Sequence, residues 1–184
     1  QTVAEVFRAA PRRHWQTPTG QRMAVASSNM GTWGWMSDAL GYRYSRTDPN
    51  TGEPWPALPF WLQQLVSELA AQAGFTGFVP NACLINHYRM GNGMGLHRDW
   101  NEGDTLEPIV SFSLGMSARL AWGGLAYSDP LRHVWLNHGD VWVWGGDDRL
   151  RYHAIAPLEG QAHPRLGAHR LNLTFRCVHA KHGK

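Results

Sequence analysis

Two residues near the middle of the chain, His97 and Asp99, have the types and the spacing of metal ligands. Side chains two positions apart on an extended strand point to the same face, so both could reach one ion. Two imidazoles and one carboxylate are the ligand set of non-heme Fe(II) oxygenases, because they leave open positions on the metal. A distant histidine would have to complete the set. His-x-Asp also occurs in solvated turns, so the pattern alone does not decide the matter.

A second polar set, formed by Arg170, Asn172 and Arg176, lies near the end of the chain. Apolar residues alternate with polar ones along 170–176, so the two guanidinium groups and the amide should share one face of a strand. Two arginines and an amide suit a dicarboxylate held by forked hydrogen bonds. An exposed edge strand whose polar side chains face water is the alternative.

Further segments extend these patterns over about residues 23–176. They are residues 83–88, 96–99, 108–115, 138–146, 149–153 and 170–176. Their order and spacing resemble the AlkB family of Fe(II)- and 2-oxoglutarate-dependent dioxygenases. The resemblance implies oxidative demethylation of N-alkylated nucleobases in DNA, of the 1-methyladenine or 3-methylcytosine type, as direct-reversal repair. Such a reaction uses Fe(II), O2 and 2-oxoglutarate and releases formaldehyde, succinate and CO2.

Several histidines compete for the third ligand position. His153 ends a strand-like run and precedes the arginine strand by one connection, as the fold implied by the resemblance requires. His138 lies in Asn-His-Gly-Asp, which is typical of a tight turn, and His87 should point outward from its strand. The remaining candidates are interpreted as surface or loop residues: His133, His163, His169 and His179. We therefore predict that His97, Asp99 and His153 bind the iron and form the catalytic set.

The resemblance also assigns a cosubstrate site. Asn86 and Tyr88 are two apart on a predicted strand and should share one face. With Arg170, Asn172 and Arg176 they resemble the family's 2-oxoglutarate site, in which the arginines anchor the carboxylates. Without the resemblance, Tyr88 would be interpreted as a core residue.

Residues 23–58 are rich in Gly, Pro and aromatic residues and predict a loop-rich cover with one strand at 23–26. Aromatic residues in such a segment can simply attach it to the core. The resemblance implies instead a nucleotide-recognition lid, in which Trp35 stacks on a flipped base and Tyr42 contacts a phosphate. Stacking of this kind contributes roughly 1–3 kcal/mol per base.

Two positions, Asn101 and Tyr127, depart from the pattern of the enterobacterial members of the family. There an aspartate and an arginine, respectively, would line the lesion pocket. Asparagine can accept a hydrogen bond but offers no charge to a cationic base. A same-family oxygenase acting on RNA, protein or another non-DNA substrate is therefore the alternative function. A metal-free jelly-roll binding module is a further alternative, against which the intact ligand set argues.

The 184 residues, 43% of them hydrophobic, predict one domain with its own core. Helices are expected at 3–10 and 59–74, the second with Trp61, Leu65 and Leu69 at helical spacing and Leu62 and Val66 beside them. Strand-like runs follow at 82–88, 109–114, 119–122, 134–136, 141–144, 151–155 and 171–176. The fold class is mainly β with flanking helices, and the resemblance sharpens it to a double-stranded β-helix, or jelly-roll, core at about 78–178.

Charge and cysteine content indicate which partners and which cellular compartment to expect for the protein. The net charge of +3 permits a nucleic-acid partner, for which a cluster of basic residues at 8–22 offers a phosphate-facing patch. No run of about twenty apolar residues and no charged-then-apolar leader is present. Cys83 and Cys177 have neither metal nor redox spacing and are expected to be free thiols, which favours the cytoplasm. No heptad pattern indicates a dimer, so a monomer is expected.

Overall fold

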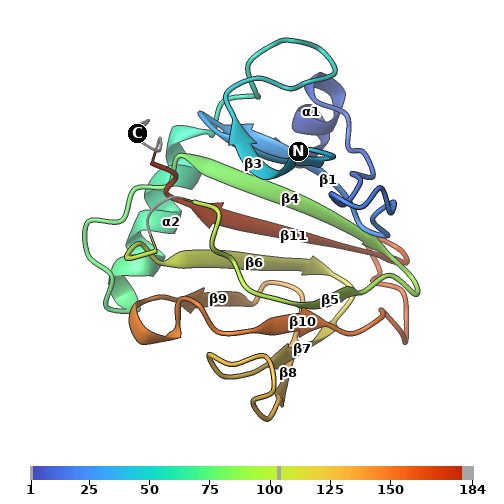
Figure 1. Cartoon of the computed structure of the whole chain (residues 1–184), viewed down its shortest axis with the longest axis vertical. Coiled ribbons are helices and arrows are strands. Elements are labelled where there is room, and N and C mark those ends of the chain that lie inside the picture. Colours follow the sequence, from blue (N-terminus) through green and yellow to red (C-terminus); the bar gives the residue numbers. More distant parts are fainter. Residues whose placement is uncertain (1, 103–104, 180–184) are drawn as a thin grey trace.

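Two antiparallel sheets and a separate hairpin make up most of the computed structural model, which describes residues 2–102 and 105–179 (Figure 1). The large sheet has the order β1 (Ala26–Gly31), β4 (Ala82–Arg89), β11 (His169–Arg176), β6 (Ile109–Gly115) and β9 (Val141–Trp144). The small sheet has the order β5 (Met94–His97), β10 (His153–Ile155), β7 (Ala118–Trp122) and β8 (Arg132–Leu136). The hairpin pairs β2 (Gly34–Asp38) with β3 (Gly41–Ser45), and a short 3-10 helix spans Gly146–Asp148. This architecture confirms the predicted jelly-roll of a mainly β protein.

Strand β11 lies at the centre of the large sheet, between β4 and β6. Its register places Arg170 opposite Tyr88 and Asn172 opposite Asn86. Because successive side chains of a strand point to opposite faces, the polar set of β11 faces the small sheet and its apolar residues face the other way. The alternation expected from the sequence is therefore used to build a polar interior face and an apolar outer face.

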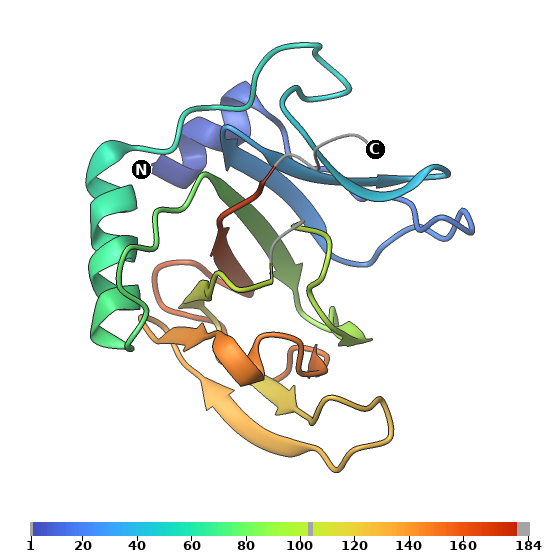
Figure 2. The ribbon, with the colours of Figure 1, turned by 60° about the vertical axis from the view of Figure 1, so that its left-hand side comes forward.

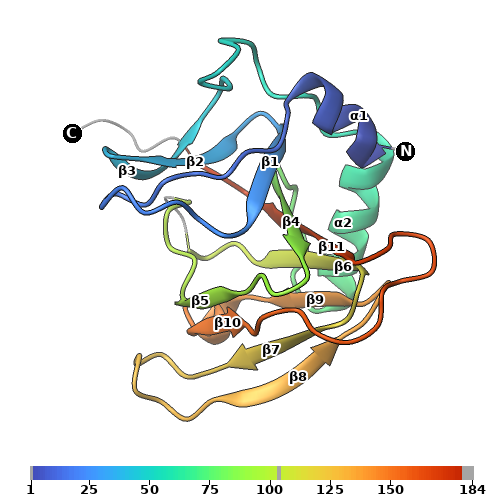
Figure 3. The ribbon, with the colours of Figure 1, turned by 90° about the vertical axis from the view of Figure 1, so that its right-hand side faces the viewer.

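Two helices, α1 (Thr2–Ala9) and α2 (Phe60–Gln72), cover the outer face of the large sheet (Figures 2 and 3). The main core lies between them and the sheet, where Val66 of α2 and Phe175 of β11 are fully buried. Neither helix is long and apolar enough to cross a membrane, within the described part of the chain.

The buried face of α2 uses part of the apolar pattern expected from the sequence. Leu62, Val66 and Ala70 are buried, whereas Trp61 is 58% exposed and Leu65 is 38% exposed. The sequence placed Leu62 and Val66 beside the stripe of Trp61, Leu65 and Leu69, and both stripes have helical spacing. Periodicity fixes the helix but not the face that it buries when two adjacent stripes are apolar.

Residues 23–58 contain three strands, where the sequence predicted a loop-rich segment with one strand at 23–26. The first strand begins at Ala26, where the predicted one ends, and pairs with β4 at the edge of the large sheet. Ser27, Ser28 and Asn29 of this strand are polar yet buried. Ser28 donates to the Ala10 carbonyl, and Asn29 exchanges two hydrogen bonds with the Trp35 backbone. Buried polar residues of this kind give no hydrophobic pattern from which a strand could be predicted.

Candidate active site

A cavity of about 910 Å³ lies between the two sheets and under the β2–β3 hairpin. Its walls combine residues from β4, β6 and β11 of the large sheet with residues from β5, β7 and β10 of the small sheet. The three predicted iron ligands, His97, Asp99 and His153, all line it. A concave site of this size that gathers charged side chains is the natural place for the chemistry.

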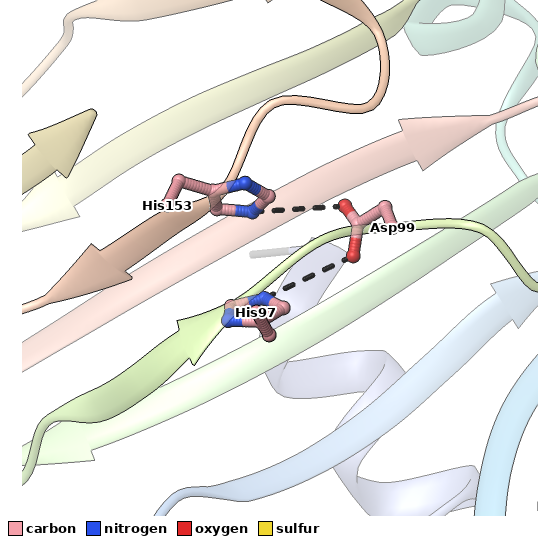
Figure 4. A group of neighbouring side chains, drawn as sticks. All are labelled: His97, Asp99 and His153. Atoms are coloured by element: carbon pink, nitrogen blue, oxygen red, sulfur yellow. Dashed lines mark ion pairs between the residues drawn. The ribbon is translucent and has the colours of Figure 1, made fainter. Parts of the chain in front are cut away.

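The fold brings the three predicted ligands together although they are far apart in the chain (Figure 4). His97 and His153 are direct partners in the β5–β10 register, so both rings lie on the same face, with centroids 4.4 Å apart. The Nε2 atoms of His97 and His153 lie 3.9 Å and 4.0 Å from the two carboxylate oxygens of Asp99. β5 ends at His97, so Asp99 lies just beyond the strand on which the sequence had placed it.

Backbone carbonyls fix the orientation of both histidine rings. The Nδ1 atom of His97 lies 2.8 Å from the Gly95 carbonyl oxygen, and Nδ1 of His153 lies 3.1 Å from that of Arg151. A carbonyl can only accept, so each Nδ1 carries the hydrogen and each Nε2 keeps its lone pair for the cavity. Ligating histidines in metalloproteins are held by such second hydrogen bonds.

The electrostatic environment keeps Asp99 and His153 in the protonation state that binds a metal. Burial raises the pKa of Asp99, but the Arg176 guanidinium and the two imidazoles outweigh burial and hold that pKa well below its usual range. Burial lowers the pKa of His153 to about 4, against the partial opposition of Asp99. Rings of Trp122 and Trp144 pack within 5.8 Å of the His153 ring and keep water from it.

Acidification below pH 6.5 is expected to destabilise the iron-free protein. In the unfolded chain a histidine takes up a proton near pH 6.5, whereas folded His153 stays neutral down to about pH 4. The unfolded state therefore binds more protons in this window, so stability present above pH 6.5 is lost as the pH falls towards 4. The difference for this residue should be up to about 3 kcal/mol. Urea denaturation at both ends of the window measures it. A His153→Gln variant should lose less stability than wild type, and an equal loss would contradict the account.

Arg170 is a buried cation whose charge the described residues do not satisfy. It is 1% exposed, its Nη2 donates to Ser113 Oγ at 2.9 Å, and its guanidinium lies 5.1 Å over the Tyr88 ring, with which it also interacts electrostatically. The buried Nε and Nη1 atoms have no hydrogen-bond partner among the described residues. A buried charge is costly unless it is paired, so this guanidinium is suited to an anionic ligand.

Three other predicted cosubstrate residues line the same cavity as this guanidinium. Asn86 and Tyr88 lie opposite Asn172 and Arg170 in the sheet, and all four side chains line the cavity. The amide of Asn172 donates to Ser111 Oγ at 2.6 Å and to the Phe112 carbonyl at 3.1 Å. Asn86 donates to Asn172 over a long distance of 3.5 Å, and the Tyr88 hydroxyl lies 3.9 Å from the Met94 sulfur and also interacts with Arg170. Neither side chain is held by a short, strong hydrogen bond from these donors, so both are suited to donate to a ligand.

Arg176 has different surroundings from Arg170, although the sequence suggested one shared role. Its Nη2 donates to Asp99 Oδ2 at 2.6 Å, and its Nε lies 3.2 Å from Glu102 Oε1. Two carboxylates therefore already balance its charge. Arg176 holds the Asp99 carboxylate in place beside the two histidines and presents the rest of its guanidinium to the cavity.

Sequence reasoning missed Glu102 and Arg149, two buried residues that hold Asp99 and Arg176 in place. Both are 2% exposed, and Arg149 donates to Glu102 Oε2 at 3.1 Å and to the Asp99 carbonyl at 2.6 Å. The Tyr44 hydroxyl donates to the other Glu102 oxygen at 2.9 Å. The position of Glu102 three residues after Asp99 was the one available signal, and an acidic residue in a polar stretch is usually solvated.

The four predicted substrate residues separate into two groups. Trp35 and Tyr42 lie diagonally across the hairpin, where Trp35 pairs with Tyr44 and Tyr42 with Ser37. Their rings are stacked with centroids 5.8 Å apart, and both line the cavity together with Asn101. Tyr127 does not line it. Its side chain is 66% exposed and touches the cavity residue Tyr152 edge-on at 5.4 Å. The two aromatic residues of the hairpin therefore form part of the cavity wall.

The donor sets fit the groups that the resemblance implies. Two imidazole nitrogens and a carboxylate match a facial iron triad with open positions. The two unsatisfied guanidinium atoms of buried Arg170 match one carboxylate of a dicarboxylic acid. His97, Asp99 and His153 could thus hold the metal, and Arg170 with Asn86 and Tyr88 could hold 2-oxoglutarate.

Comparisons with known proteins agree with this chemistry. Residues 1–176 match the 2OG-Fe(II) oxygenase superfamily. The chain is 48% identical over 174 residues to the "Alpha-ketoglutarate-dependent dioxygenase AlkB" of Salmonella typhimurium, covering 95% of this chain and 81% of that protein. It is 33% identical over 117 residues to the mouse "Nucleic acid dioxygenase ALKBH1", covering 63% of this chain and 30% of that one. The solved structure of OsALKBH1 superposes with a TM-score of 0.75 at 27% identity, over 91% of this chain and 84% of the other. The chain therefore belongs to the AlkB family of the 2OG-Fe(II) oxygenase superfamily, and it is a dioxygenase that uses Fe(II), 2-oxoglutarate and O2.

Proposed function

We propose that this dioxygenase removes methyl groups from N-alkylated nucleobases of the 1-methyladenine and 3-methylcytosine type in DNA. The stacked pair of Trp35 and Tyr42 on the wall of the cavity that holds the His-Asp-His cluster is the observation that supports this substrate most. Aromatic side chains bind bases by stacking, and a base inside a duplex cannot reach a buried site. The substrate is therefore single-stranded or carries a flipped base.

Each part of the site has its own task in this proposal. Arg170, Asn86 and Tyr88 bind the remote carboxylate of 2-oxoglutarate, and Arg176 orients Asp99 and contacts the keto acid end. Trp122 and Trp144 exclude water next to His153. When bound, Fe(II) would supply the oxidising chemistry by which O2, 2-oxoglutarate and the N-methyl group are converted to CO2, succinate and an N-hydroxymethyl group, with one oxygen atom of O2 in each of the last two. That hydroxymethyl group leaves as formaldehyde and restores the base.

Residues 23–58 act as the recognition lid and residues 78–178 as the catalytic core in this proposal. Arg22 lines the cavity and is available to phosphate, whereas Arg13 is paired with Asp48 at 2.5 Å. The basic patch suggested by the sequence is thereby reduced. We further propose that the protein is a monomer and acts in the cytoplasm. Cys83 and Cys177 form no disulfide, and reduced cysteines are typical of that compartment.

Replacing Trp35 by alanine is expected to weaken binding of a methylated oligonucleotide. Loss of one stacking platform removes roughly 1–3 kcal/mol, or about 5- to 150-fold in affinity. Fluorescence anisotropy with a labelled single strand measures the change. Trp61→Ala removes a similarly large side chain from the exposed face of α2, which lies outside the cavity, and should leave affinity unchanged. Equal effects of the two substitutions would contradict the role of Trp35.

Asn101→Asp is expected to raise kcat/KM on 1-methyladenine, which carries a positive charge. The acidic residues among the described cavity residues, Asp99 and Glu102, are both ion-paired with Arg176, so neither is free to attract a cation. A charged hydrogen bond exceeds a neutral one by about 1 kcal/mol, or about fivefold. Rates on single-stranded oligonucleotides measure this, with Asn50→Asp on the exposed surface as the matched control. An unchanged or lower rate for Asn101→Asp would show that Asn101 does not face the base.

Mass spectrometry of an oligonucleotide with one 1-methyladenine or 3-methylcytosine tests the proposed function. Protein, Fe(II), 2-oxoglutarate and air should together remove the mass of one methylene unit, and omission of 2-oxoglutarate should prevent the loss. RNA of the same sequence and a methyl-lysine peptide form parallel samples. Loss of methyl from the peptide with no change in DNA would overturn the proposal in favour of the alternative substrate class.

A further inference from the structure

A second cluster of potential metal ligands lies outside the dioxygenase cavity, at the end of the large sheet where the central strand β11 finishes. It consists of Glu107, Cys177 and His179. Cys177 and His179 follow β11, and Glu107 precedes β6, which is the neighbouring strand (Figure 1). The three donor atoms, a sulfur, a ring nitrogen and a carboxylate oxygen, lie within 4.8 Å of one another.

The distances in this cluster suit a small tetrahedral ion. The Cys177 sulfur lies 3.4 Å from Nε2 of His179. Ordinary Zn–S and Zn–N bonds at a tetrahedral angle place the two donor atoms about 3.5 Å apart. One ion between the two side chains would therefore need almost no rearrangement of that pair, and the Glu107 carboxylate is close enough to complete a third position.

The backbone that carries these side chains is held on both sides. Val178, between the two C-terminal ligands, is buried, and its N–H and C=O are bonded to the Asn81 side chain at 2.8 Å and 2.9 Å. The N–H of His179 donates to the Glu102 carbonyl at 3.1 Å. The Glu107 carbonyl accepts from Arg149 Nε at 2.9 Å. Because the backbone next to the ligands is already held in place, little conformational entropy is lost when an ion binds.

We propose that Glu107, Cys177 and His179 form a second metal site, selective for a zinc-type ion. Thiolate and imidazole together favour Zn²⁺ over hard cations such as Mg²⁺, and a carboxylate is a common third ligand. Three protein ligands leave one position for water. The dioxygenase cluster contains no thiolate, so the two sites differ in the ions that they prefer.

A bound ion would link two segments that carry active-site residues, although the ion itself would lie outside the cavity. Glu107 and Glu102 belong to the segment that follows Asp99, and Cys177 follows Arg176 directly. Crosslinking these segments through a metal restrains the ion pairs of Arg176 with Asp99 and Glu102. We expect zinc at this site to raise the Tm of the protein even where the dioxygenase cluster has been disabled.

The test uses Co²⁺, because cobalt in a site with thiolate shows a sulfur-to-metal charge-transfer band in the near ultraviolet. The full chain with His97→Ala and Asp99→Ala, which cannot fill the first site, is titrated with Co²⁺ and then with Zn²⁺. The proposal predicts one equivalent of cobalt with the charge-transfer band, displaced by zinc. Cys177→Ser should abolish the band and His179→Ala should abolish or strongly weaken it, whereas Cys83→Ala, at a buried cysteine, should keep it.

Three results would overturn the proposal. One is the absence of the band in the protein with both cysteines. Another is a band that survives Cys177→Ser and disappears in Cys83→Ala. Because His179 is exposed, its substitution should leave the fold intact, so a folded His179→Ala protein that keeps the full band would also decide against the site. None of these outcomes depends on demethylation.

Discussion

His97→Ala is expected to reduce turnover by more than about 100-fold, since loss of a residue that merely supports a metal ligand already costs about 10- to 100-fold. The side chain of His97 is 35% exposed and packs against the other two ligands more than against the core. Its removal should therefore leave the free energy of unfolding within about 1 kcal/mol of wild type, as for most exposed positions. Succinate formation and denaturant unfolding measure the two quantities separately.

A matched histidine provides the control for this prediction. His133 is exposed on β8 and lies outside the cavity lining, so His133→Ala should retain wild-type turnover. Iron titration of the apo-protein gives a second reading, in which His97→Ala loses affinity and His133→Ala does not. Retained turnover in His97→Ala would remove His97 from the ligand set and leave the cluster unexplained.

Arg170→Met is expected to raise the KM for 2-oxoglutarate by about 30-fold or more. Breaking a buried, hydrogen-bonded charge pair between protein and ligand costs about 2–5 kcal/mol. The same substitution should leave the ligand-free protein as stable as wild type or more stable. In that state Arg170 is a buried cation with two unsatisfied donors among the described residues, and methionine of similar length removes this cost.

Arg176→Met should have the opposite effect on the ligand-free protein. Arg176 balances Asp99 and Glu102, so its loss leaves two buried carboxylates with less compensation and should destabilise the fold by about 3–5 kcal/mol. Denaturation of both variants, with Arg119→Met on the exposed face of β7 as control, measures the contrast. If both substitutions destabilised the ligand-free protein equally, the charge of Arg170 would have to be balanced in the folded state, which would contradict the account.

The sequence was sufficient to predict the parts of the site that depend on local spacing. The alternation along 170–176 placed Arg170, Asn172 and Arg176 on one face, and the register confirms that geometry and adds Asn86 and Tyr88 opposite them. His153 was selected over the other histidines because it ends a strand-like run one connection before the arginine strand, as the fold implied by the resemblance requires. The structure places it directly opposite His97.

The parts that could not be predicted depend on tertiary contacts between polar residues. Glu102 and Arg149 are distant in the chain, and their ion pair forms only when the fold buries them together. Tyr127 lies outside the cavity although its sequence position matched a pocket residue, because the position of a side chain on an exposed loop does not follow from its place in a motif. His87 lies on the outer face, as expected from alternation, but it is buried under Phe7 of α1 rather than exposed.

The stoichiometry of the coupled reaction tests the central claim most directly. A single-stranded oligonucleotide with an isotopically labelled N-methyl group on adenine N1 or cytosine N3 is incubated with the protein, Fe(II), 2-oxoglutarate and O2, and labelled formaldehyde and succinate are both quantified. The account predicts one formaldehyde for each methyl group removed and a matching amount of succinate, with neither product above background in His97→Ala. Succinate at the same rate with methylated and unmethylated oligonucleotide, and no labelled formaldehyde, would contradict nucleobase demethylation.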